Sequence, residues 1–215
     1  MQNKKLQEVH EETCVKISKA LAKLTNKHAV VDIVNPRIEE VNGLTLPIGP
    51  DEVVAGVCLP VSGEVKGAAL LLFPQQTAFD LSDLLIKREP GTTKELTELD
   101  KSALEELGNI VCGNYFANLS NESKVKIIEH IPQFNLDTFG TILSQTKAEF
   151  AQKTQEVLTI EIEFNFVVLS LKGYFLLIFE TEQFQIILDA LEQAVAQKLY
   201  VTGETADSER INNAK

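Results

Sequence analysis

Apolar residues recur at helical spacing in five segments of the chain, and few helix breakers interrupt them. The segments are residues 7–24, 76–87, a stretch that starts at Thr92 or Ser102 and passes Leu119, 138–153 and 181–199. We predict an amphipathic helix at each of them. The run from Arg88 to Gly91 is expected to end the second helix, because Pro90 lacks an amide donor and Gly91 is flexible.

Runs rich in apolar and β-branched residues predict strands between these helices. The runs are residues 29–41, 52–61, 64–73, 124–131, 157–171 and 174–180. Ser62-Gly63 and Lys172-Gly173 each separate two neighbouring runs, which predicts two tight hairpins. Pro36 confines its strand to a sheet edge or a bulge.

The two halves share the order helix, strand, hairpin, helix, which indicates an internal duplication. A shift of 96 residues places Pro36 on Pro132 (36 to 132), and only the second half has a helix at 138–153. We predict an α+β fold of two pseudo-twofold related units, with a mostly antiparallel sheet flanked by helices. One domain is expected over residues 1–201, with repeats at about 1–90 and 91–201, followed by a polar, disordered tail at 202–215.

Composition narrows the function classes. The chain has 215 residues, 44% of them apolar, and a formal charge of −11, which argues against nucleic acid as a partner. No run is long and apolar enough for a membrane span, and Met1–Lys5 lacks a signal-peptide core, so we expect a cytoplasmic protein. Cys14, Cys58 and Cys112 are expected to be buried or half-buried thiols, and the scattered histidines predict neither a metal site nor a cofactor.

Candidate chemistry lies in the third predicted helix. Ser102, Glu106 and Asn109 follow one another at spacings of four and three residues, and Pro132 comes after twenty-two further residues. On a helix these three polar side chains fall within about 60° of one another. The apolar residues of the helix gather on the opposite side, so the carboxylate and the carboxamide are predicted to face outward together.

This spacing of Ser102, Glu106, Asn109 and Pro132 resembles the signature of the CheC/CheX/FliY phosphatases of bacterial and archaeal chemotaxis. The resemblance implies the duplicated fold predicted above and dephosphorylation of the aspartyl phosphate of a CheY-type response regulator. It implies that Asn109 orients the attacking water and that Glu106 pairs with a lysine of the regulator. The divalent metal, Mg²⁺, is expected on the regulator and not on this chain.

The remaining signature residues have two interpretations each. Ser102 lies at the edge of the expected contact, but it could equally be a helix cap with Glu105. Gly113, on the same stripe, lets a partner's backbone approach or serves helix packing. Pro132 shapes the entry of a strand or breaks an edge strand.

The first half does not repeat the signature. The shift of 96 residues puts Leu6, His10 and Thr13 where Ser102, Glu106 and Asn109 stand, and none of the three keeps the chemistry. The sequence therefore predicts one intact site. The alternative function is a non-catalytic CheC-like binding module that docks a response regulator, the deamidase CheD or the flagellar switch. The duplication already supplies a pseudo-twofold pairing, so we expect a monomer.

Overall fold

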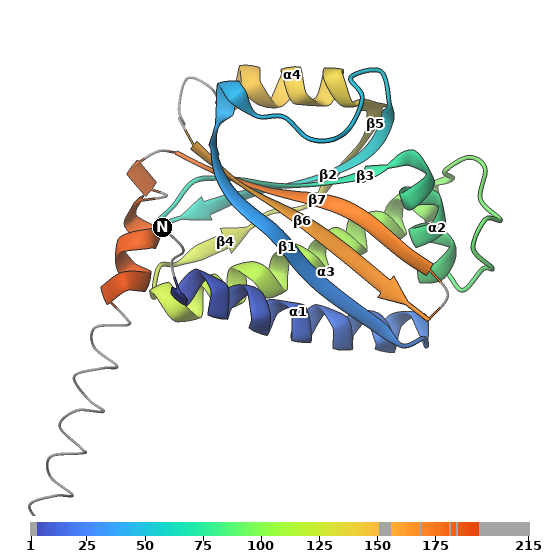
Figure 1. The fold of residues 1–215 in the computed structure, drawn as a ribbon, viewed down its shortest axis with the longest axis horizontal. Helices are drawn as coiled ribbons and strands as arrows, with labels where there is room; N and C mark the ends of the chain where they lie inside the picture. Colours follow the sequence, from blue (N-terminus) through green and yellow to red (C-terminus); the bar gives the residue numbers. More distant parts are fainter. Residues whose placement is uncertain (1–3, 151–155, 168, 181, 184, 194–215) are drawn as a thin grey trace, which may run out of the picture.

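One antiparallel sheet organises the molecule (Figure 1). The computed structural model describes residues 4–150, 156–167, 169–180, 182–183 and 185–193. The sheet has the strand order β1-β6-β7-β3-β2-β4, and β5 also pairs with β2. The strands are β1 (Ala29–Glu40), β2 (Val53–Gly63), β3 (Gly67–Pro74), β4 (Ile127–Glu129), β5 (Gln133–Thr138), β6 (Glu156–Phe166) and β7 (Leu169–Phe179).

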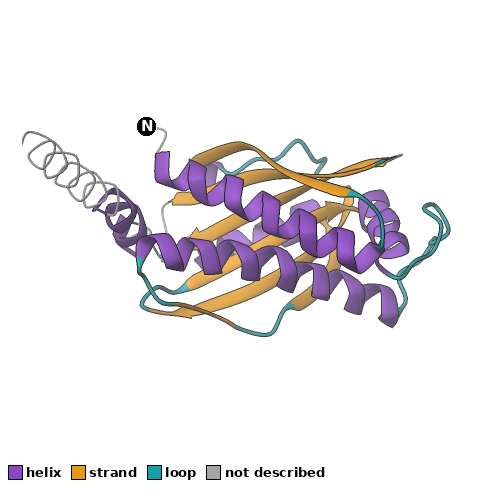
Figure 2. Ribbon diagram, turned by 90° about the horizontal axis from the view of Figure 1, so that it is seen from below, coloured by secondary structure: helices purple, strands orange, loops and turns teal. Residues whose placement is uncertain are grey.

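Helices cover both faces of this sheet. Figure 2 shows α1 (Lys4–Thr25) and α3 (Glu98–Ser123) side by side across one face. At one end lies α2 (Gln75–Leu85), whereas α4 (Phe139–Phe150) lies on the opposite face, and residues 182–183 and 185–193 are helical as well. The predicted α+β class is thus confirmed. Among the described helices, none combines the length and the apolarity that a membrane crossing requires.

The core has two parts, one on each side of the sheet. The larger part joins α1, α2 and α3 to the sheet and contains the fully buried Tyr115, Phe116 and Phe175. The smaller part lies under α4 and the loop after η1 (Val41–Gly43), with Leu44 at its centre. Cys112 is buried and Cys14 and Cys58 are half-buried, as the sequence predicts.

The pseudo-twofold relation runs through the seam between β3 and β7. Ala29 pairs with Phe166 in the first half and Ile127 pairs with Gly63 in the second. At the other end of these strands, Glu40 pairs with Glu156 and Thr138 pairs with Val53. The residues of β4 and β5 therefore follow their counterparts in β1 by 98 positions (29 to 127, 40 to 138). The residues of β6 follow their counterparts in β2 by 103 positions (63 to 166, 53 to 156).

The helices follow the same offset of 98 residues. Thr25 and Ser123 each donate a side-chain hydrogen bond to the carbonyl four residues earlier, and each accepts one from the amide two residues later. Asn26 and Lys124, which follow them, both have a positive φ, of 54° and 62°. The predicted shift of 96 residues was therefore wrong by two, because the two prolines are not structural counterparts.

The first predicted hairpin turn, Ser62-Gly63, lies within a longer connection, and the second was misplaced. In the first hairpin β2 runs on to Gly63, because its last residues also pair with β4, and residues 62–66 make the connection to Gly67. In the second, Phe166 already pairs with Leu169, so that Lys172 and Gly173 lie inside β7. Close packing requires glycine at position 173, because a Cβ there would come 2.7 Å from the ring of Phe73.

Three further boundaries differ from the prediction. The strand predicted at residues 124–131 shortens to β4, and the polar strand β5 was not predicted. The second helix ends at Leu85, before the Arg88–Gly91 run, and Lys87 takes a left-handed conformation with φ 63°. Parts of the predicted helices at 138–153 and 181–199, and the whole tail at 202–215, lie outside the described residues.

Candidate functional site

The N-terminus of α3 is fixed by a capping box. The Thr97 hydroxyl accepts a hydrogen bond from the Asp100 amide, and the Asp100 carboxylate accepts one from the Thr97 amide at 2.8 Å. Both predicted starts of this helix, Thr92 and Ser102, were therefore wrong. The helix begins at Glu98, so Ser102 lies inside its first turns and is not a cap.

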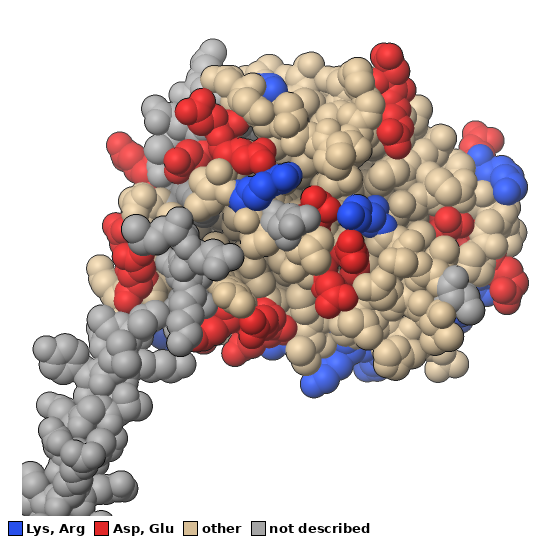
Figure 3. Space-filling view, viewed as in Figure 1, with Lys and Arg blue, Asp and Glu red and all other residues tan. Residues whose placement is uncertain are grey.

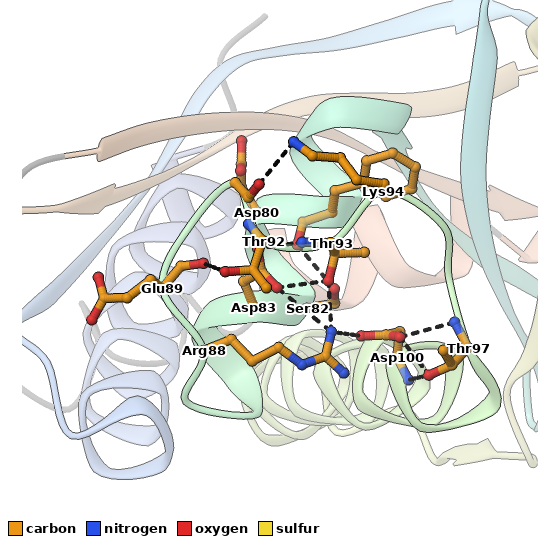
Figure 4. Close-up of polar contacts among 12 residues, drawn as sticks. Asp80, Ser82, Asp83, Arg88, Glu89, Thr92, Thr93, Lys94, Thr97 and Asp100 are labelled. Atoms are coloured by element: carbon orange, nitrogen blue, oxygen red, sulfur yellow. Dashed lines mark hydrogen bonds and ion pairs between the residues drawn. The ribbon is translucent and has the colours of Figure 1, made fainter.

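A buried polar cluster anchors the loop in front of this cap (Figure 4). Arg88 Nη1 lies 2.9 Å from Asp100 Oδ1, 3.6 Å from Asp83 Oδ1 and 2.6 Å from Thr93 Oγ1. Asp83 also accepts hydrogen bonds from the amides of Thr92 and Thr93. Burial opposes ionisation of Asp100, but hydrogen bonds from Thr97 and the charge of Arg88 hold its pKa below the usual range. The loop between α2 and α3 is thereby fixed against both helices.

Close packing holds the middle of α3 against the sheet. A Cβ at Gly108 would come 2.6 Å from Val57 Cγ1 of β2, so only glycine allows this approach. On the side of α1, His10 Nε2 lies 2.9 Å from the Tyr115 hydroxyl, and Asn118 donates to the Thr13 hydroxyl at 2.9 Å. The exposed face of α3 is thus carried by a helix that is held from beneath and from one side.

The predicted signature residues share this exposed face. Ser102, Glu106 and Asn109 are all exposed, and Gly113 continues their stripe one turn after Asn109. Within the described part of the chain, the side chains of Ser102, Glu106 and Asn109 take part in no hydrogen bond or ion pair. Pro132 lies apart from them, at the interruption between β4 and β5. The face can therefore present a carboxylate and a carboxamide, one turn apart, to another molecule.

One further acidic residue adjoins this face and was missed from the sequence. Glu129, the last residue of β4, lies beside Gly113: a Cβ on that glycine would be 3.3 Å from Oε2 and 3.9 Å from Oε1. Burial raises the pKa of the Glu129 carboxyl above its usual range. In the sequence, Glu129 is one of several polar residues in the run from Lys124 to Ile131, so only the packing of β4 against α3 reveals it.

In the first half, the counterparts of the signature pair are two carboxylates. The offset of 98 residues relates Glu106 to Glu8 and Asn109 to Glu11 (8 to 106, 11 to 109). The predicted counterparts His10 and Thr13 are instead buried. Figure 3 shows acidic side chains gathered over the N-terminal part of α1. The first helix thus keeps a glutamate but has no carboxamide next to it.

The two halves also differ in how closely the helix approaches the sheet. His10 occupies the position that corresponds to Gly108 (10 to 108), so α1 carries an imidazole ring where α3 packs against the sheet without a side chain. A cleft of about 750 Å³ opens between α1 and β1, and His10, Glu11, Cys14 and Asp32 contribute to its walls. Burial lowers the pKa of His10 to about 4, so the imidazole is neutral at neutral pH.

Comparison with known sequences matches the segment that contains α3 and β4. The profile of the CheC-like family matches residues 99–134, which include Ser102, Glu106, Asn109, Gly113 and Pro132. The CheY-P phosphatase CheC of Bacillus subtilis (strain 168) is 29% identical over 115 residues, which are 53% of this chain and 55% of that protein. The match thus spans about half the length of this curated relative.

Solved structures share the fold. The X-ray structure of Thermotoga maritima FliY superposes with a TM-score of 0.69 at 15% identity, covering 87% of this chain and 93% of that chain. The FliM middle domain from H. pylori gives a TM-score of 0.64 at 11% identity, over 88% and 97%.

Fold and signature together define a duplicated α+β protein with a Glu/Asn pair exposed on one helix. In its fold and in the spacing of its signature residues, this chain resembles the CheC/CheX/FliY proteins.

Proposed function

We propose that this protein dephosphorylates the aspartyl phosphate of a CheY-type response regulator. The observation that carries the proposal is the exposure of Glu106 and Asn109, one turn apart, on a helix fixed from beneath. The similarity to a CheY-P phosphatase supports it. Asn109 orients the attacking water, because a carboxamide oxygen accepts a hydrogen bond from water while its NH₂ group can donate to another acceptor.

The chemistry suits a protein that supplies only positioning. An acyl phosphate has a good leaving group, and the regulator provides its own divalent metal and lysine around the phosphoryl oxygens. Phosphoryl transfer depends mainly on orientation and electrostatics, so a water held in line accelerates it. Glu106 pairs with the lysine of the regulator and sets the register of the two proteins.

The test is the decay rate of a phosphorylated response regulator from the same genome. The native protein is expected to accelerate the decay, and Asn109→Ala should reduce this acceleration about 100-fold or more, as is typical when one positioned polar group is removed. Glu106→Gln should weaken it through binding. Asn121→Ala is the matched control, because Asn121 is exposed on the same helix but lies off the stripe.

A non-catalytic binding module is the second candidate. The pair Glu8 and Glu11 favours it, because the duplicated helix has kept acidic side chains and has no carboxamide there. Binding of a regulator without accelerated decay, in the native protein and in Asn109→Ala alike, would replace the phosphatase proposal with this one.

A further inference from the structure

The position of Glu129 gives the signature face a second carboxylate. Glu106, Asn109 and Gly113 lie on one stripe of α3, and the Glu129 carboxylate occupies the space beside Gly113. Seven residues separate Glu106 from Gly113, which is roughly 10 Å along a helix axis. Asn109 is therefore flanked by one carboxylate on each side.

This second carboxylate has no cation of its own in the described part of the chain. The ion pairs and hydrogen bonds there do not include the Glu129 side chain, although its backbone pairs with Val61 of β2. A partly desolvated carboxylate interacts more strongly with a cation than a fully hydrated one does. Glu129 is exposed, so a cation of a partner can reach this carboxylate.

One exposed apolar side chain lies two residues from Glu129 along the chain. Ile131 is 83% exposed, whereas Ile128, the neighbour of Glu129 in β4, points to the opposite face of the sheet. Exposed large apolar residues beside a charged group are typical of a protein contact, because they exclude water from the ion pair when the partner docks. Two carboxylates and the exposed Ile131 are thus available to a partner.

On the basis of the proposed function, we infer that Glu129 is a second docking carboxylate for the response regulator. Gly113 leaves room for this carboxylate beside α3. The partner that fits this face presents two cationic side chains roughly 10 Å apart, one on each side of its phosphoryl group. Gly113 then acts through Glu129 and does not contact the partner's backbone.

The test measures binding and turnover separately. The dissociation constant is measured for a regulator activated with beryllium fluoride, which mimics the aspartyl phosphate, and KM and kcat are measured with the phosphorylated form. We expect Glu129→Ala to raise Kd and KM about tenfold, with kcat unchanged, and to reduce the salt dependence of binding. Glu149→Ala is the control, because Glu149 is exposed on α4 across the sheet and should bind as the native protein does.

A double-mutant cycle assigns the role of Gly113. Gly113→Ala should weaken binding in the native background, because the new Cβ displaces the carboxylate, and should have little effect in Glu129→Ala. An equal loss in both backgrounds would mean that Gly113 contacts the partner directly and would overturn the inference.

Failure of the inference and failure of the proposed function give different results. Native binding and turnover in Glu129→Ala refute the inference and leave the phosphatase intact. Binding by the native protein without turnover refutes the phosphatase, and the affinity of Glu129→Ala still decides the inference. If the native protein binds no regulator of its genome, both fail.

Discussion

At the scale of single residues, the exposed pair Glu106 and Asn109 depends on side chains that no partner touches. His10 of α1 lies within hydrogen-bond distance of Tyr115 of α3, and Arg88 joins Asp83 of α2 to Asp100 in the first turn of α3. Each is a buried or partly buried polar contact between elements that are distant in sequence. Their protonation and pairing therefore affect the stability of the site without entering its chemistry.

The buried His10 makes stability depend on pH. Burial lowers the pKa of His10 from 6.5 to about 4, so below pH 6.5 the unfolded chain binds a proton that the folded chain resists. The contribution is therefore fully present above pH 6.5 and is lost as pH falls toward 4, by about 2–3 kcal/mol at pH 4.5. His10→Gln should lack this loss. The measurement is urea unfolding of both proteins at pH 7.5 and 4.5, and an equal drop in the two would contradict it.

The Arg88 cluster is expected to be a major contributor to stability. Arg88→Met leaves two fully buried carboxylates without their cation, although both keep hydrogen bonds from threonines. Arg88 is itself 31% exposed, so we expect a loss of about 2–3 kcal/mol, somewhat below that of a fully buried pair. Urea unfolding at pH 7 measures it, with Lys101→Met, which removes a surface pair with Glu98, as the control. A loss below about 0.5 kcal/mol would show that the threonines suffice.

At the scale of elements, the position of α3 is set by its contact with β2. Gly108 allows the approach on one side of the helix, while Gly113 accommodates Glu129 on the other. The neighbour of Gly108 is a buried, β-branched valine that cannot yield, whereas the neighbour of Gly113 is the end of a flexible side chain. The two glycines thus serve different purposes in one helix.

These glycines give a matched pair of variants. Gly108→Ala should lower the free energy of unfolding by about 1–3 kcal/mol through overpacking against Val57. Gly113→Ala should leave it unchanged or raise it by up to about 1 kcal/mol, because alanine is the better helix former and the carboxylate can move. Thermal unfolding of both variants measures the difference. Equal values of Tm would indicate that α3 does not pack tightly on β2.

Much of this arrangement could be predicted from the sequence, and the remainder depended on tertiary contacts. The helices were found because their buried faces repeat at helical spacing, and the stripe of Glu106 and Asn109 follows from the same geometry. The N-cap of α3 at Thr97 was missed because Thr92 and Ser102 are competing caps in the sequence. Only the contact of Arg88 with Asp100 selects Thr97. The turn after Phe166 was missed because it contains valine and no glycine or proline.

At the scale of the whole molecule, both halves build one sheet. Strands β3 and β7 form the seam, and each of the two core parts contains residues from both halves. Matching the prolines gave a shift of 96 residues, whereas burial and strand pairing give 98. The two halves are thus better aligned by burial and strand pairing than by matching their prolines.

The shared sheet predicts a single unfolding transition. Because neither half has a core of its own, residues 1–90 should not unfold separately from residues 91–193. Calorimetry and far-UV circular dichroism should give the same midpoint, with equal calorimetric and van't Hoff enthalpies. Two separated heat-capacity peaks would instead define two independent domains.

The two margins of the sheet have a consequence for solubility. An unbroken edge strand offers its amides and carbonyls to any similar strand and so promotes aggregation. Here β1 contains a bulge around Pro36, and the opposite margin is divided at Pro132 into two short strands. Neither margin of the folded sheet therefore offers a long, regular strand for pairing with a second molecule.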